Sequence, residues 1–211
     1  MQTLFSPDSM FMRIMSRICD LLLLNILFLL TCIPIFTVGA AVTALYSCCF
    51  RLEDEPGVIK GYFRAFRENF RQSTLAWLLL TLCSGSALFN TMLFHAFPGW
   101  LRYLAIPFGI LFALSSLAGS CVFPLTSRFS NDLGTTFKNA LFLSLGYLPR
   151  FALLTFLNLL PGIVLFWDVY LFFQTGFLWI AIYFSFTAYV GTLLLKKVFS
   201  PYLPPAESEE A

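Results

Sequence analysis

Apolar positions dominate the chain in five long runs, separated by shorter segments that carry most of the charged residues. Each run has about the 18 to 20 residues or more that one crossing of a bilayer requires, so each is predicted to be a membrane helix. The runs cover about residues 14–50, 73–94, 101–123, 142–167 and 177–195. The pattern predicts an all-α integral membrane protein, built as a bundle of about five transmembrane helices.

The first run, residues 14–50, is nearly twice as long as one crossing requires. Pro34 lies near its middle, and proline removes a backbone donor and disfavours helix at the preceding residue. The first helix is therefore predicted to break at Pro34, with the hydroxyls of Thr31 and Thr37 bonding to the freed backbone groups. The piece after the break is only about 20 Å long as a helix, which favours five spans. Two full crossings would give six.

Small residues follow the break at helical spacing. Gly39 and Thr43 lie four residues apart, and Ser115 and Gly119 form a similar face in the third run. Small faces let membrane helices approach closely, so we expect these two faces to pack together.

The break can be interpreted in two ways. It is either a packing kink or, as in transporters, part of a substrate site. Asp20 is expected to pair with Arg17, and Asn25 is expected to hydrogen-bond between helices. The candidate residues for either role are Asp20, Asn25, Pro34, Thr37, Gly39 and Thr43.

A basic stripe marks the polar segment 51–72. One helical face carries Lys60, Arg64, Arg67 and Arg71, and the neighbouring face carries Phe63, Phe66 and Phe70. An aromatic face beside a basic face is typical of an amphipathic helix at a membrane surface, with the rings in the lipid and the cations at the phosphates. A docking surface for a partner protein is the alternative, and the two roles are compatible.

The distribution of Lys and Arg predicts the orientation. The segment 51–72, the segment 128–138 and the residues Lys196 and Lys197 would share the cytoplasmic side, because basic residues are enriched there. With five spans the N-terminus is then outside; with six it is inside, together with Arg13 and Arg17. Residues 1–197 are predicted to form one polytopic domain, followed by a flexible, Pro-rich and acidic tail over 198–211.

Composition supports the membrane assignment and argues against several functions. The chain is 59% hydrophobic and 11% charged, whereas soluble domains carry about 25% charged residues. The lipid bilayer is therefore the expected environment, and the few basic residues do not suggest binding to nucleic acid. The single histidine, His95, has no partner for a zinc motif, and no P-loop or G-x-S-x-G motif is present. No catalytic, cofactor or metal-binding residue is predicted.

The stretch "DLLLLNILFLLTCIPIFTVGAAVTALYSCCF", followed by "YFRAFRENFRQSTLAWLLL" and "VFPLTSRF", resembles the YesL family of bacterial integral membrane proteins. The resemblance extends over about residues 14–197 and is most specific in its N-terminal part. The positions that match the family's pattern there are Asp20, Asn25, Pro34, Thr37, Gly39, Thr43 and Ala44.

Members of the YesL family are often associated with genes for carbohydrate uptake and glycan breakdown. The resemblance therefore implies a non-enzymatic accessory protein of the cell membrane that acts in carbohydrate uptake or sensing. Its partner would be a transporter permease or a sensor kinase, docked on the helix 60–71 and the segment 128–138. The alternative is a small transporter with a site at the broken first helix.

Overall fold

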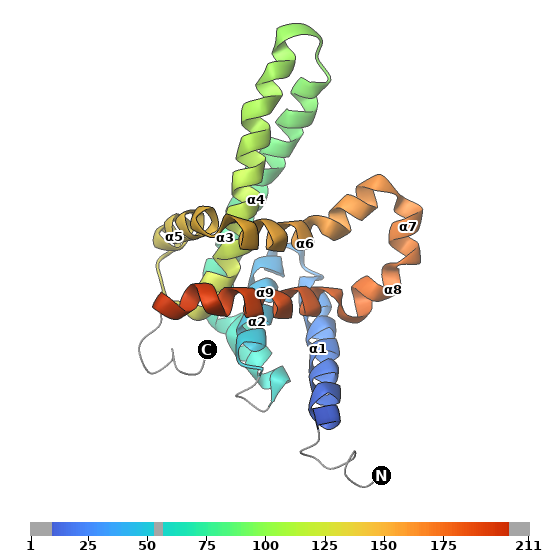
Figure 1. Cartoon of the computed structure of the whole chain (residues 1–211), viewed down its shortest axis with the longest axis vertical. Helices are drawn as coiled ribbons and strands as arrows, with labels where there is room; N and C mark the ends of the chain where they lie inside the picture. Colours follow the sequence, from blue (N-terminus) through green and yellow to red (C-terminus); the bar gives the residue numbers. More distant parts are fainter. Residues whose placement is uncertain (1–9, 53–56, 203–211) are drawn as a thin grey trace.

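The protein is all-helical in residues 10–52 and 57–202, which are the residues that the structure, a computed structural model, describes. The elements are α1 (Met10–Cys32), η1 (Ile35–Thr37), α2 (Val38–Phe50), α3 (Val58–His95), η2 (Gly99–Leu104), α4 (Ala105–Arg128), α5 (Leu133–Gly146), α6 (Leu148–Trp167), α7 (Val169–Gln174), α8 (Gly176–Leu178), η3 (Trp179–Tyr183), α9 (Phe184–Phe199) and η4 (Ser200–Tyr202). Figure 1 shows their arrangement.

Five helical segments within these residues are long and apolar enough to cross a membrane. They are Ile14–Cys32, Val58–His95, Gly99–Arg128, Leu148–Trp167 and Gly176–Tyr202. A further apolar segment, Ile35–Phe50, is shorter. The chain therefore has the helical content, length and composition of a multi-pass membrane protein.

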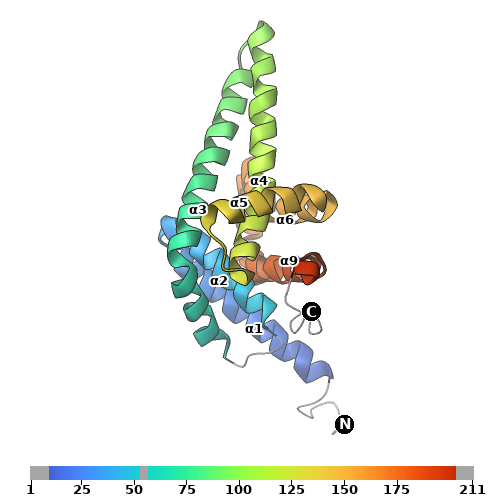
Figure 2. The same cartoon turned by 90° about the vertical axis from the view of Figure 1, so that its left-hand side faces the viewer.

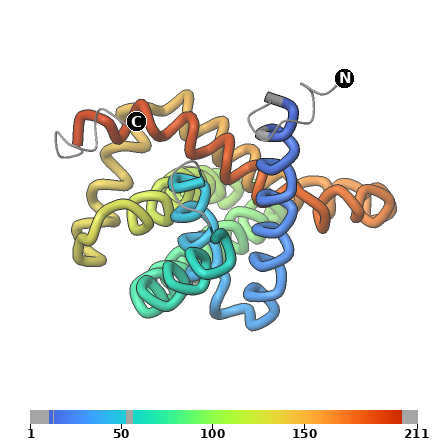
Figure 3. The backbone as a smooth tube through the Cα atoms, turned by 90° about the horizontal axis from the view of Figure 1, so that it is seen from below, coloured from blue at the N-terminus to red at the C-terminus, as the bar shows by residue number. Residues whose placement is uncertain are grey.

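The chain reverses direction between α1 and α2. Pro34 lies between the end of α1 and the turn η1, and α2 then runs back beside α1 (Figures 1 and 3). The Thr37 hydroxyl donates to the carbonyl oxygens of Thr31 and Pro34, the latter at 2.6 Å. The Thr31 hydroxyl donates to the carbonyl oxygen of Leu27 at 2.9 Å. Thr37 thus bonds to the backbone around the turn, as expected from the sequence, whereas the Thr31 hydroxyl bonds back within α1.

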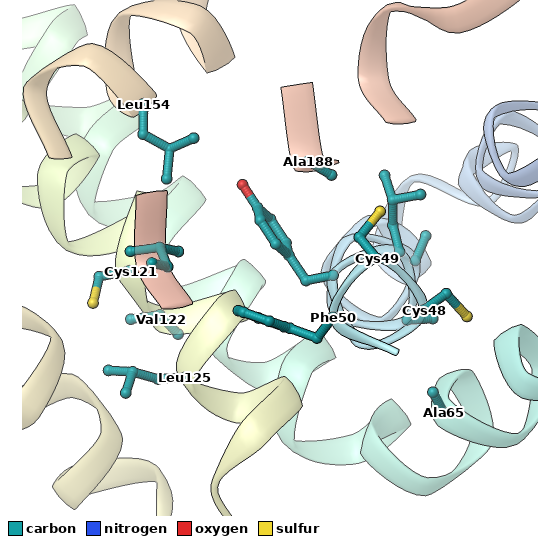
Figure 4. Packing of buried hydrophobic residues seen from close by; sticks show 14 of the residues in the cluster. Cys48, Cys49, Phe50, Ala65, Cys121, Val122, Leu125, Leu154 and Ala188 are labelled. Carbon is teal, nitrogen blue, oxygen red and sulfur yellow. The ribbon is translucent and has the colours of Figure 1, made fainter. Parts of the chain in front are cut away.

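Helix α2 lies at the centre of the fold. Nearly all of its residues from Gly39 to Phe50 are buried, and it packs against α1, α3, α4 and α9. Figure 4 shows Phe50 pointing toward Val122 and Leu125 of α4. The Phe50 ring also lies 6.0 Å from the Phe199 ring of α9. A short apolar helix is thereby removed from lipid by the four longer helices around it.

The small face of α2 was expected to pack against the small face of α4. In the structure it packs against α3 instead. A Cβ atom added to Gly39 would overlap the backbone carbonyl oxygen of Ser73 and the Cβ of Trp77. The hydroxyls of Thr43 and Ser73 lie 2.8 Å apart and form a hydrogen bond. Helix α3 follows α2 after a short connection and offers this polar partner, so the close approach is made there.

Helix α3 is one continuous helix of 38 residues. The polar segment predicted over 51–72 is therefore not separate from the span: from Val58 onward it forms the first part of α3. The physical reason is that no proline interrupts Val58–His95. Helices α3 and α4 form a long antiparallel hairpin, and the half that contains its turn extends away from the other helices (Figures 1 and 2).

The later boundaries also differ from the predicted ones. Helix α4 continues through Pro124 to Arg128, and the Ser127 hydroxyl donates to the Pro124 carbonyl oxygen at 2.7 Å. The predicted helix 142–167 is divided at Tyr147, because Pro149 lies in the first turn of α6, where its missing N–H costs no hydrogen bond.

Helices α6 and α9 pack together and run across the direction of the α3–α4 hairpin (Figures 1 and 2). Helix α9 extends to Phe199, beyond the predicted end at residue 195, and η4 follows it. Of the predicted tail 198–211, residues 203–211 lie outside the described residues.

The contact at Gly39 yields a stability prediction. The variant Gly39→Ala is expected to lose about 1–3 kcal/mol of unfolding free energy, because the added methyl group forces α2 away from the α3 backbone. Thermal unfolding of the purified protein in mild detergent measures the effect. The matched control is Gly85→Ala, where a Cβ meets no atom within 4 Å and alanine is the better helix former. Equal stability of the two variants would contradict the close approach.

Candidate functional site

Asn25 joins α1 to the last membrane helix. Its side chain is fully buried, and its Nδ2 donates to the carbonyl oxygens of Trp179 at 3.3 Å and Ile180 at 2.6 Å. Its Oδ1 accepts a hydrogen bond from the backbone N–H of Ser185 at 3.0 Å. One amide therefore bonds to three backbone groups of a helix more than 150 residues away in the chain.

The backbone that Asn25 contacts is irregular. Residues Trp179–Tyr183 form a π-helical turn between α8 and α9. Such a turn shifts the hydrogen-bond ladder by one residue and leaves backbone groups that need other partners, which in lipid must come from the protein. Asn25 supplies them. The expectation that this amide bonds between helices agrees with the structure.

The other candidate residues at the helix break are engaged in contacts within the chain. Thr37 bonds to the turn, and Gly39 and Thr43 lie against α3, as described above. Asp20 is half-buried, and Arg17, the partner expected for it, lies three residues earlier on the same helix. Arg17 also donates to the Tyr189 hydroxyl of α9 at 3.4 Å. These contacts are typical of residues that pack helices together.

The basic stripe lies on the exposed face of the first part of α3. The side chains of Lys60, Arg64, Arg67 and Arg71 are all exposed. Of the three phenylalanines beside them, Phe63 is 49% exposed. Phe66 and Phe70 are half-buried, with ring centroids 5.5 Å apart, and Phe66 stacks on the buried Tyr62 at 6.4 Å. Phe66 and Phe70 thus pack partly against the chain itself.

The fold brings the two polar segments together. The side chain of Gln72, at the end of the basic part of α3, donates to the carbonyl oxygen of Asn131 at 2.7 Å. Asn131 precedes α5, whose first turn is capped by the Asp132 side chain, and α5 carries the exposed Lys138. Arg128 lies over the Phe50 ring, 5.6 Å from its centroid. The hydrogen bond between Gln72 and Asn131 therefore joins the end of the basic part of α3 to the loop that precedes α5.

A cavity of about 530 Å³ lies within the apolar part of the fold, and nothing in the sequence predicts it directly. Its walls come mainly from α2, α3, α4 and α6, with Phe28 of α1 and Phe184 of α9. The small face of α4 lines it, through Ser115, Gly119 and neighbouring serines. The face of α4 that was expected to pack against Gly39 therefore lines this cavity instead.

Hydroxyl groups around the cavity pair across helices. Ser84 of α3 donates to Ser115 of α4 at 2.8 Å, and the hydroxyls of Ser120 and Thr155 on α6 lie 2.9 Å apart. These pairs join α3 to α4 and α4 to α6. In each pair the two hydroxyl groups satisfy each other's hydrogen bonding, which polar groups in an apolar environment require.

Two polar side chains at the cavity are less well satisfied. The Tyr46 hydroxyl is buried and has no hydrogen bond of normal geometry among the described residues, although it interacts with Asn158. The Tyr46 side chain and Leu154 of α6 both lie close to Gly191 of α9. Asn158 lies near the middle of α6, is exposed and lines the cavity. An amide at that depth in a membrane helix indicates a polar contact.

Comparison with known proteins gives one match. Residues 21–91 match the family model described as "Protein of unknown function, DUF624". The matched part comprises α1 from Leu21 onward, α2, and α3 as far as Thr91, and so contains the turn at Pro34 and the basic stripe. No curated protein and no solved structure matches the chain. The chain is thus similar, over α1, α2 and most of α3, to a family of unknown function.

The contacts of Asn25 lead to a second prediction. Asn25→Leu is expected to lower the unfolding free energy by about 2–4 kcal/mol, since three hydrogen bonds inside the membrane domain disappear. Hydrogen exchange at residues 179–185 is expected to accelerate in the same variant. The control is Asn90→Leu, because Asn90 bonds only within its own helix, to the Ser86 carbonyl oxygen at 2.8 Å. Unchanged exchange in the Asn25 variant would show that the π-helical turn does not depend on this amide.

Proposed function

We propose that this protein is a non-enzymatic accessory membrane protein that binds a partner through its basic surface, in a system for carbohydrate uptake or sensing. The basic surface is defined here as Lys60, Arg64, Arg67 and Arg71 of α3 together with Lys138 of α5. The partner is a transporter permease or a sensor kinase.

The observation that supports this proposal is the hydrogen bond from Gln72 to Asn131, which links the end of the basic part of α3 to the loop before α5. These two residues are 59 positions apart in the chain, and we propose that the basic segments beside them act as one surface. Exposed arginines on a rigid helix favour recognition of carboxylates, because the guanidinium presents a planar set of donors. An acidic surface on the partner is the expected complement.

The carbohydrate context rests on the resemblance of residues 14–197 to the YesL family. The match of residues 21–91 to a family of unknown function is compatible with that assignment. The match itself names no substrate, pathway or partner. The cell membrane of a bacterium is the corresponding location.

The transporter alternative places a site at the broken first helix. Asn25, Thr37, Gly39 and Thr43 each have partners within the chain, and none of them lines the cavity described above. These contacts favour the packing role of the break over a substrate site, so the accessory role is preferred.

The orientation we propose has the start of α1 and the start of α3 on the cytoplasmic side. Because the chain reverses at Pro34, both starts lie at the same end of the fold (Figures 1 and 2). This arrangement favours an N-terminus on the cytoplasmic side, as in the topology with six crossings. It argues against the outside N-terminus that was expected from five spans. It also brings Arg17 to the side where the other basic residues lie, in agreement with the charge rule.

Charge reversal tests the basic surface. Replacing Arg64, Arg67 and Arg71 with Glu is expected to reduce the recovery of a crosslinked permease or sensor kinase at least about tenfold, because attraction becomes repulsion at three positions. Crosslinking in native membranes followed by mass spectrometry identifies and quantifies the partner.

Two controls separate docking from attachment to lipid. Arg102→Glu changes the charge in η2, at the far end of the hairpin, and should leave recovery unchanged. Lysine at positions 64, 67 and 71 keeps the charge but removes the planar donor geometry, and should weaken a protein partner more than a lipid surface. Full recovery of the partner with three glutamates would refute the docking role.

Cysteine labelling tests the orientation. In a variant without its native cysteines, Ile14→Cys and Lys60→Cys are expected to react with a membrane-impermeant maleimide only after the membrane is opened. Arg102→Cys, at the far end of the α3–α4 hairpin, is expected to react in intact cells. Reaction of position 14 from outside while position 60 stays protected would restore the outside N-terminus.

A further inference from the structure

We propose that the cavity between α3, α4 and α6 binds an uncharged membrane amphiphile, meaning a molecule with an apolar body and one or two hydroxyl, ester or ketone oxygens. The proposal rests on the cavity alone and does not depend on the partner proposed for the basic surface. The amphiphile would enter from the bilayer.

The size and walls of the cavity suit an apolar body. Its volume of about 530 Å³ lies within the range of about 300–1,000 Å³ that is typical of small-molecule sites. Aromatic rings form much of the wall, including Trp77 of α3, Phe112 and Phe123 of α4, and Phe184. These rings offer wide apolar contact to an acyl chain or a ring system.

A polar anchor is present at one point of this wall. Asn158 lines the cavity near the middle of α6, and its side chain interacts with the Tyr46 hydroxyl. An amide has two donor hydrogens and an acceptor oxygen, so one hydroxyl leaves capacity unused. The serine and threonine pairs nearby are bonded to each other. The hydroxyls of Ser116 and Thr81 also line the cavity, but the Asn158 amide offers both donors and an acceptor, so we take it as the group that a ligand oxygen would contact.

The absence of charge narrows the ligand class. None of the described residues that line the cavity is Lys, Arg, His, Asp or Glu. A phosphate, carboxylate or ammonium group inside it would lack a counter-charge in a medium of low dielectric constant. The ligand is therefore neutral in the part that enters.

The opening of the cavity fits a lipid better than a protein helix. Gly85 and Leu88 of α3 and Leu159 of α6 line it and are exposed, so it opens between these helices. A helix about 10 Å across would fill 530 Å³ with about 7 Å of its length, little more than one turn. A lipid can place part of an acyl chain in the same space while the rest of its apolar body stays in the bilayer.

Fluorescence quenching tests the proposal, because Trp77 lines the cavity. The other tryptophans, Trp100, Trp167 and Trp179, are replaced with Phe in the full-length chain. The protein is placed in phosphatidylcholine nanodiscs that contain increasing amounts of 1,2-dioleoylglycerol with brominated acyl chains. Quenching of Trp77 is expected to saturate with brominated dioleoylglycerol and to rise only in proportion to its amount with brominated phosphatidylcholine.

Matched variants show whether the amide is the anchor. Asn158→Leu keeps a similar side-chain volume, and is expected to raise the half-saturating amount of dioleoylglycerol about tenfold through loss of the hydrogen bond. Asn90→Leu, whose amide bonds within α3, should leave it unchanged. Native mass spectrometry of the unaltered protein, with and without added dioleoylglycerol, is an independent readout and should show one retained molecule.

Two results would overturn the proposal. Quenching that does not saturate, or that is identical in the Asn158 variant, would mean that ordinary lipid chains fill the cavity. Protection of Trp77 from both brominated lipids, together with crosslinks between copies of the chain at residues 85 and 159, would mean that a second protein covers it.

Discussion

The close packing of α2 against α3 is the contact on which the rest of the fold depends. Gly39 lets the two backbones approach so closely that a methyl group has no room, and the hydrogen bond between Thr43 and Ser73 fixes their register. Once α2 is seated, it presents Phe50 to α4 and α9 and Tyr46 to α6 and α9. A short helix that could not span a bilayer alone thus becomes the core around which the longer helices assemble.

The second constraint is that polar groups must be satisfied where water is absent. The turn at Pro34 meets it locally with the hydroxyl of Thr37, and the π-helical turn meets it with Asn25 of α1. The second solution ties irregular backbone to another helix. Asn158 is the contrasting case, since its amide opens into a cavity.

Helix α3 connects the two proposed roles. Its first part carries the exposed basic residues and bonds to the loop before α5 through Gln72, while its middle part lines the cavity through Trp77 and Ser84. The Ser73 contact with α2 lies between them. A ligand that moved α3 relative to α4 would therefore act on the same rigid helix that bears the basic surface.

The sequence alone determined the features that depend on composition and local periodicity. Apolar length indicated five spanning helices, Pro34 indicated the interruption, and the spacing of Lys60, Arg64, Arg67 and Arg71 indicated one exposed face. Each is a property of a segment and needs no knowledge of its neighbours.

Tertiary structure decided which faces meet, because a face of small residues is compatible with many partners. It placed Gly39 against α3, left Ser115 and Gly119 to line a cavity, and brought Asn25 to a helix at the other end of the chain. It also turned α2 back beside α1, because the direction of the chain after a proline depends on what the next helix can pack against and not on the proline itself.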